Sequence, residues 1–125
     1  MLRAIADWLK RWFNGLFGAR HDYVSVVMNA APEDSGIDNG QLIVVAWEGR
    51  AKWALLKCPC LCGETIRLSL AGARRPRWEV SIDEPGIPTV FPSVRQTAGC
   101  FSHFWIKKGF VRWCADSGSP WMAGG

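Results

Sequence analysis

Two short clusters of cysteine and histidine constrain this chain more than any other feature of its sequence. The first occupies residues 58–64 (CPCLCGE) and the second residues 99–103 (GCFSH). Together they hold four of the five cysteines and one of the two histidines. Thiolate and imidazole groups are the ligands that tetrahedral zinc sites use. The two clusters therefore predict a metal site that joins distant parts of the chain.

The spacing within each cluster indicates how its ligands converge. A turn in the first cluster can bring two thiols to one side of a knuckle, because Gly63 readily accepts the positive φ that such a turn requires. In the second cluster a single turn can place an imidazole beside a thiolate. Two facing knuckles then supply four nitrogen and sulfur ligands. The predicted zinc ligands are Cys60, Cys62, Cys100 and His103, with Cys58 as an alternative ligand.

Length, composition and charge limit the class of protein. A chain of 125 residues with 49% hydrophobic residues suits one domain with its own core. The net charge of +4 permits anionic partners without requiring them. No apolar run reaches membrane-spanning length, and the charged start does not match a secretory signal. We therefore expect a cytoplasmic protein, in which clustered cysteines favour metal over disulfides.

Residues 1–22 are predicted to form an amphipathic helix. Apolar side chains recur at steps of three and four residues, at Leu2, Ile5, Leu9, Trp12 and Leu16. Such a stripe can pack on its own domain, dock a partner protein or lie on an anionic membrane surface. The last alternative would place the protein at the periphery of a membrane.

The remaining chain divides into a metal-binding β domain at residues 23–114 and a flexible tail at residues 115–125. Short runs with alternating polar and apolar residues, separated by glycine and proline turns, predict strands in the β domain. We expect a mostly β, small α+β fold with a zinc-ribbon or Rieske-like pair of knuckles behind the N-terminal helix. A two-iron cluster stays open as an alternative, although the first knuckle offers no histidine.

Several motifs resemble one bacterial family of proteins. They are CPCLCGE at residues 58–64, TVFPSV at residues 89–94, GCFSHFWI at residues 99–106 and VRWC at residues 111–114. Their order and spacing over residues 40–114 resemble the domain-of-unknown-function family six-five-two-seven. Leu61 stands where that family usually has glycine.

Genes of that family lie beside multi-ubiquitin-like, E1-like and E2-like genes. The resemblance implies a part in bacterial ubiquitin-like conjugation and phage defence. The partners that it implies are a ubiquitin-like protein, an E1-like protein and an E2-like protein. It also implies a peptidase that processes or removes the ubiquitin-like protein.

Two chemistries could support such a peptidase. A zinc ion with an open position needs a general base, for which Glu64 is placed two residues past Cys62. A covalent mechanism needs a nucleophile beside a base. The predicted catalytic residues are Glu64 and Ser102. The alternative nucleophiles are Ser93 and Cys58, and the candidate bases for a covalent mechanism are His103 and His21.

Two functions without catalysis are also open. A zinc module could dock the E1-like, E2-like or ubiquitin-like protein through exposed tryptophans. Nucleic-acid binding is the less favoured reading. It would use basic residues beside aromatic ones, such as Arg77, Lys107 and Arg112 beside Trp78 and Trp105.

Overall fold

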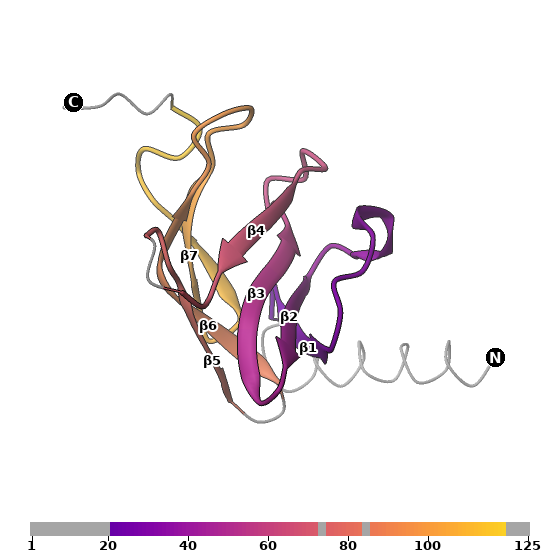
Figure 1. The fold of residues 1–125 in the computed structure, drawn as a ribbon. Helices are drawn as coiled ribbons and strands as arrows, with labels where there is room; N and C mark the ends of the chain where they lie inside the picture. Colours follow the sequence, from indigo (N-terminus) through magenta and orange to yellow (C-terminus); the bar gives the residue numbers. More distant parts are fainter. Residues whose placement is uncertain (1–20, 73–74, 84–85, 120–125) are drawn as a thin grey trace, which may run out of the picture.

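The protein folds into two four-stranded β-sheets, as the computed structural model shows for residues 21–72, 75–83 and 86–119 (Figure 1). The strand order is β1-β2-β3-β4 in the first sheet and β5-β6-β7-β8 in the second. The first-sheet strands are β1 (Val24–Met28), β2 (Gln41–Trp47), β3 (Arg50–Lys57) and β4 (Thr65–Ser69). The second-sheet strands are β5 (Glu79–Asp83), β6 (Ile87–Arg95), β7 (His103–Lys107) and β8 (Phe110–Trp113).

Local turn chemistry fixes the pairing of neighbouring strands. β2 and β3 form a hairpin in which Trp47 pairs with Arg50 across a two-residue loop. Both loop residues, Glu48 and Gly49, have positive φ, which suits the right-handed twist of the two strands. β1 instead runs parallel to β2, and a loop that contains the 3₁₀ turn η1 (Asp34–Gly36) connects them.

The hydrophobic core lies between the facing sides of the two sheets. It combines side chains from β2, β3 and β4 with side chains from β6 and β7, and Tyr23 and Cys58 join it. Because successive strand residues point to opposite faces, the residues between these core positions point away from the core. The buried strand residues of this core are Leu42, Val44, Ala54, Leu56, Ile66, Leu68, Val90, Val94, Phe104 and Ile106.

The outer faces of the two sheets differ in how they are covered. On the first sheet, Ile43, Val45 and Leu55 form a second buried cluster with Ile37 from the loop between β1 and β2. The outer face of the second sheet carries polar side chains, among them Ser93 on β6, together with the exposed ring of Phe91. The outer face of the second sheet is therefore accessible, and it combines polar and aromatic side chains.

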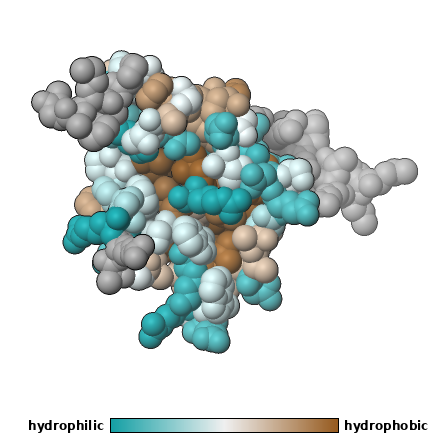
Figure 2. All heavy atoms as spheres, turned by 45° about the horizontal axis from the view of Figure 1, so that its top comes forward, coloured by the Kyte–Doolittle hydropathy of each residue, from teal (hydrophilic) through white to brown (hydrophobic). Residues whose placement is uncertain are grey.

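Part of the surface is apolar. At the end of the molecule that is uppermost in Figure 1, apolar residues are visible in a gap between hydrophilic ones (Figure 2). Within the described ranges, no helix is long and apolar enough to cross a membrane.

The expected small α+β class needs correction. The residues that the structure describes form strands, turns and one 3₁₀ turn, with no α-helix, so their class is all-β with two sheets. The mostly β expectation is confirmed. The helix predicted for residues 1–22 falls almost entirely on residues 1–20, which lie outside the described residues. The two-knuckle analogy considered the ligand loops alone, whereas long-range pairing of eight strands sets the architecture.

Candidate functional site

The two cysteine clusters form tight knuckles at the ends of strands. The first knuckle links β3 to β4 and is closed by a 2.9 Å hydrogen bond from the Cys58 amide to the Glu64 carbonyl. Leu61 and Gly63 both have positive φ there, so the chain reverses within a few residues. The second knuckle links β6 to β7 and is closed by a 2.8 Å bond from the Gln96 amide to the Ser102 carbonyl.

These knuckles bring four cysteine sulfurs together. The Sγ atoms of Cys58, Cys60, Cys62 and Cys100 all lie within 4.8 Å of one another. Cys58 Sγ lies 3.3 Å from that of Cys60 and 3.7 Å from that of Cys100. A tetrahedral site with metal–sulfur bonds of about 2.3 Å needs sulfurs about 3.8 Å apart. The four cysteines could therefore hold a metal ion with small adjustments.

Protonation of the thiols is uneven within this group. Burial raises the pKa of Cys58 to about 12, although a hydrogen bond with Ser102 opposes that effect. Burial also disfavours the thiolate of Cys60, but hydrogen bonding with Ser102 and Cys58 lowers its pKa to about 6. Close thiols cannot all ionise without a compensating cation, so this donor set suits a divalent metal.

Ser102 belongs to the cysteine group. Its side chain is buried, and its hydroxyl donates a 3.2 Å hydrogen bond to the sulfur of Cys100. The sulfur of Cys58 lies 3.5 Å from the same oxygen. The hydroxyl thus contacts two of the four sulfurs, those of Cys58 and Cys100, from the protein interior.

A separate chain of polar contacts lies on the outer face of the second sheet. Ser93 Oγ lies 3.0 Å from Nε2 of His103, and Nδ1 on the other side of that ring lies 2.7 Å from Oδ1 of Asp116. The three residues follow one another at intervals of ten and thirteen positions. A hydroxyl, an imidazole and a carboxylate in this order form the arrangement of a serine-protease triad, which geometry rather than chain order identifies.

Strand pairing explains how Ser93 and His103 meet. Arg95 on β6 pairs with His103 on β7, and Ser93 precedes Arg95 by two residues on the same face. The register between β6 and β7 shifts between Val90 and Val94, so β6 is bulged next to Ser93. Bulges re-aim side chains near functional sites.

The backbone at Ser93 is anchored from the neighbouring segment. The indole Nε1 of Trp78 donates a 3.2 Å hydrogen bond to the carbonyl oxygen of Ser93. Two aromatic rings, those of Phe91 and Trp105, lie nearby with their centroids 6.0 Å apart. The serine is therefore held by the sheet on one side and by a half-buried tryptophan on the other.

Asp116 comes from a hydrogen-bonded turn after β8. The amide of Ser117 donates to the carbonyl of Cys114 at 3.0 Å, and the amide of Gly118 donates to that of Phe101 at 2.8 Å. The Ser117 hydroxyl accepts a 3.0 Å bond from the amide of His103. Residues 115–119 of the predicted tail are thus attached to β7, and residues 120–125 lie outside the described residues.

Arg95 places a positive charge beside His103 and Asp116. Its guanidinium donates to the second oxygen of Asp116 and lies 2.9 Å from Nδ1 of His103. Hydrogen bonds from Arg95 and His103 lower the pKa of Asp116 to about 2. Because the carboxylate accepts from Nδ1, Nε2 is left free to accept the proton of Ser93.

The structure separates residues that the sequence reasoning had grouped. His103, a predicted zinc ligand, lies outside the four-sulfur group and contacts Ser93 and Asp116 instead. Glu64 is exposed at the end of the first knuckle, and Ser102 faces sulfur atoms. His21, the other candidate base, stacks against Phe110 with centroids 4.9 Å apart.

Asp116 was missed by the sequence reasoning, and Ser93 was retained only as an alternative. No spacing rule connects Asp116 with His103, because the turn that brings them together depends on contacts between the tail and β7. Ser93 interrupts the apolar run VFPSV at residues 90–94, and that interruption is the signal that could have raised its rank.

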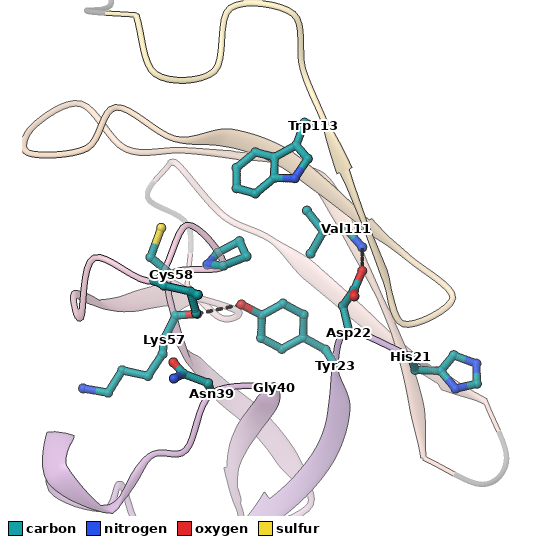
Figure 3. Close-up of a pocket in the computed structure, with 11 residues that line it drawn as sticks. His21, Asp22, Tyr23, Asn39, Gly40, Lys57, Cys58, Val111 and Trp113 are labelled. Carbon is teal, nitrogen blue, oxygen red and sulfur yellow. Dashed lines mark hydrogen bonds between the residues drawn. The ribbon is translucent and has the colours of Figure 1, made fainter. Parts of the chain in front are cut away.

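Two recesses flank these groups. A pocket of about 430 Å³ lies beside Cys58, between the segment around Tyr23 and β8 (Figure 3). Its β8 residues, Val111 and Trp113, pair with core residues and so lie on the opposite face of the sheet from Trp105. A smaller recess of about 220 Å³ adjoins Ser93 in the chain. It is lined by Arg75, Arg77, Glu79, Phe91 and Pro92.

Polar contacts stabilise the wall of the larger pocket. The hydroxyl of Tyr23 donates a 2.6 Å hydrogen bond to the carbonyl of Lys57, directly before the first knuckle (Figure 3). The carboxylate of Asp22 accepts a 2.7 Å bond from the amide of Val111 on β8. These contacts tie the residues that precede β1 to both sheets.

Comparison with known proteins identifies the family of this chain. A family model described as the bacterial ubiquitination-like system serine protease (BubE) matches residues 28–114. The match covers more than half of the chain, and the chain belongs to this family. It agrees with the ubiquitin-like context that the sequence resemblance implied, but it names this family and not the numbered one. No curated protein and no solved structure matches.

Proposed function

We propose that this family member is a serine peptidase. It cleaves the bond that joins the last residue of a ubiquitin-like protein to the group attached there. Ser93 is the nucleophile, His103 the general base and Asp116 the residue that orients the imidazole. The observation that carries the proposal is the pair of contacts on opposite sides of one ring. Ser93 Oγ lies 3.0 Å from Nε2, and Asp116 Oδ1 lies 2.7 Å from Nδ1.

The reaction follows from these contacts. Ser93 Oγ attacks the carbonyl carbon of the scissile bond while its proton moves to Nε2 of His103. Asp116 stabilises the imidazolium that forms. His103 then gives the proton to the leaving amine, and an acyl-enzyme remains on Ser93. A water molecule then gives a proton to the same nitrogen and attacks the ester carbonyl, and His103 returns that proton to Ser93 Oγ as the new carboxyl end leaves.

A zinc ion held by the four cysteines supplies structural cross-linking in this proposal. Cys58, Cys60 and Cys62 lie between β3 and β4, and Cys100 lies between β6 and β7, so the site joins both sheets. A site with four sulfur ligands is closed to substrate. Since Cys100 precedes His103 by three residues, zinc held by these cysteines would fix the loop that leads into the base.

The smaller recess, which is lined by Pro92 directly before Ser93 in the chain, is the place where we expect residues next to the scissile bond to bind. It combines an exposed ring at Phe91 with the guanidinium groups of Arg75 and Arg77. We propose the ubiquitin-like protein as substrate, and the E1-like and E2-like proteins of the same system as the other partners. The family assignment supports that choice.

The test uses a ubiquitin-like protein of the same system with a peptide fused to its C-terminus. The wild-type protein should separate the two parts, and Ser93→Ala should lose at least about a thousandfold in kcat. Ser81→Ala is the matched control, because Ser81 is an exposed serine on the neighbouring strand β5. That control should keep wild-type activity.

A fluorophosphonate probe tests the nucleophile without any assumption about the substrate. It should label the wild-type protein on Ser93, and both Ser93→Ala and His103→Ala should prevent labelling. Labelling that persists in Ser93→Ala would contradict the assignment. A protein that neither cleaves the fusion nor reacts with the probe, yet binds the ubiquitin-like protein, would instead support a docking module.

A further inference from the structure

Cys114 lies beside His103 and Asp116, two members of the proposed triad, and all three have side chains that can bind a metal. The sulfur of Cys114, a ring nitrogen of His103 and a carboxylate oxygen of Asp116 lie within 4.8 Å of one another. This set is separate from the four-sulfur group and shares no residue with it. Cys114 has no role in the proposed reaction.

We propose that these three residues form an inhibitory zinc site, which switches the peptidase off when an ion binds. The inference rests on the proposed function for its regulatory meaning, but the site itself is a matter of ligand geometry. Three protein ligands plus one water make up the coordination that open zinc sites adopt.

The donor set selects the ion. A thiolate, an imidazole and a carboxylate together suit zinc, whereas calcium and magnesium prefer oxygen ligands alone. Tetrahedral bonds of about 2.0 to 2.3 Å place such ligand atoms about 3.4 to 3.7 Å apart. The observed spread of up to 4.8 Å needs only side-chain adjustment.

The backbone keeps the three ligands in place before an ion binds. The amide of Cys114 donates a 2.9 Å hydrogen bond to the carbonyl of His103. The amide of Ser117 donates to the carbonyl of Cys114 at 3.0 Å, and this closes the turn that carries Asp116. Little conformational entropy is then lost when zinc binds.

Binding and catalysis exclude each other at this site. The triad needs Asp116 as the acceptor of the Nδ1 hydrogen and His103 as a free base. An ion that takes both groups withdraws them from Ser93. Zinc would therefore lower kcat rather than compete with the substrate.

Arg95 determines how tightly the ion can bind. Its guanidinium lies 2.9 Å from Nδ1 of His103 and pairs with Asp116, so two cations would compete for the same ligands. About a quarter of the Arg95 side chain is exposed (24%), which allows it to swing towards solvent when the ion enters. Arg95 thus competes with zinc for these ligands and raises the zinc concentration that is needed to fill the site.

The experiment measures zinc binding by calorimetry on protein whose four-cysteine site is already loaded with one zinc equivalent. The wild-type protein should bind one further zinc ion. Cys114→Ser should weaken that binding at least about tenfold, because a thiolate ligand is lost. Arg95→Gln should strengthen it, because the competing charge is removed. Equal binding by the wild type and both variants would overturn the inference.

The activity arm separates this inference from the proposed function. Zinc should inhibit cleavage by the wild-type protein over the concentration range of the second binding step. Cys114→Ser should keep its basal activity and resist the ion. Binding without any peptidase activity would reject the proposed function and leave the site standing. Activity that zinc inhibits equally in the wild type and Cys114→Ser would reject the site alone.

Discussion

Arg95 and His103 occupy opposed positions on β6 and β7, and the guanidinium of the first lies 2.9 Å from Nδ1 of the second. The same guanidinium pairs with the carboxylate of Asp116, which also accepts from Nδ1. Asp116 is half exposed at 49%, so burial alone does not hold it in place. The sheet register therefore places a cation where it can fix the orientation of an exposed triad carboxylate.

Arg95 should act as a positioning residue in the proposed reaction. Arg95→Ala is expected to lower kcat by about tenfold to a hundredfold with little change in KM, because the carboxylate loses its second anchor. Arg95→Lys should recover only part of the rate, since an ammonium group lacks the planar fork of the guanidinium. Steady-state kinetics on the fusion substrate measure both. A rise in KM at constant kcat would show that Arg95 binds substrate instead.

Asp116 should raise kcat because it holds His103 in the tautomer that the reaction needs. Asp116→Asn is expected to lower kcat by about 10²- to 10⁴-fold, because an amide can donate to Nδ1 and favour the wrong tautomer. Fluorophosphonate labelling should slow in parallel. Asp83→Asn, which changes an exposed carboxylate on β5, is the control and should have wild-type rates. An unaltered rate in Asp116→Asn would remove this residue from the triad.

Acidity should affect stability through the same carboxylate. Its pKa of about 2 in the folded protein lies below the ordinary 3.8, so the unfolded state binds a proton more readily. The stabilisation is therefore fully present above about pH 4 and is lost as pH falls towards 2. Thermal unfolding between pH 2 and pH 5 should show a smaller loss on acidification for Asp116→Asn than for the wild type. Parallel curves would contradict the assigned pKa.

Removal of the zinc proposed for the four-cysteine site should destabilise the whole fold. Zinc bound by four thiolates contributes on the order of 10 kcal/mol in small domains, and here the ligands come from loops of both sheets. A strong chelator, or Cys58→Ser, is expected to lower the melting temperature and to abolish activity. Cys114→Ser is the matched control, since its thiol lies outside the four-sulfur group. Elemental analysis should find one zinc per chain in the control and less in Cys58→Ser.

The sequence revealed the cysteine cluster better than the group formed by Ser93, His103 and Asp116. Cysteines cluster visibly in the sequence, and their spacing predicted knuckles at the ends of strands, as found between β3 and β4. His103 was assigned to the metal because it follows Cys100 by three residues. In β7, however, the side chain of His103 alternates away from the buried Ser102 and reaches the outer face.

Long-range contacts explain what sequence periodicity could not supply. The strands were readable from their alternation, but not the parallel pairing of β1 with β2 or the division into two sheets. Asp116 meets His103 only because the turn after β8 bonds back to Phe101 and His103. A local pattern carries no information about such a contact.

Ser102 and Ser93, the two serines that the sequence offered as nucleophiles, should differ in what their substitution by alanine changes. The Ser102 hydroxyl is buried and donates to Cys100 Sγ. Ser102→Ala should therefore weaken zinc binding by about tenfold to a hundredfold, because a hydrogen bond to a metal ligand is lost. With zinc in excess of that weakened affinity, but below the range that inhibits the wild type, Ser102→Ala should still cleave the fusion and react with fluorophosphonate. Ser93→Ala should show the reverse, with normal zinc content and no labelling. Loss of labelling in a zinc-loaded Ser102→Ala protein would return the nucleophile to the second knuckle.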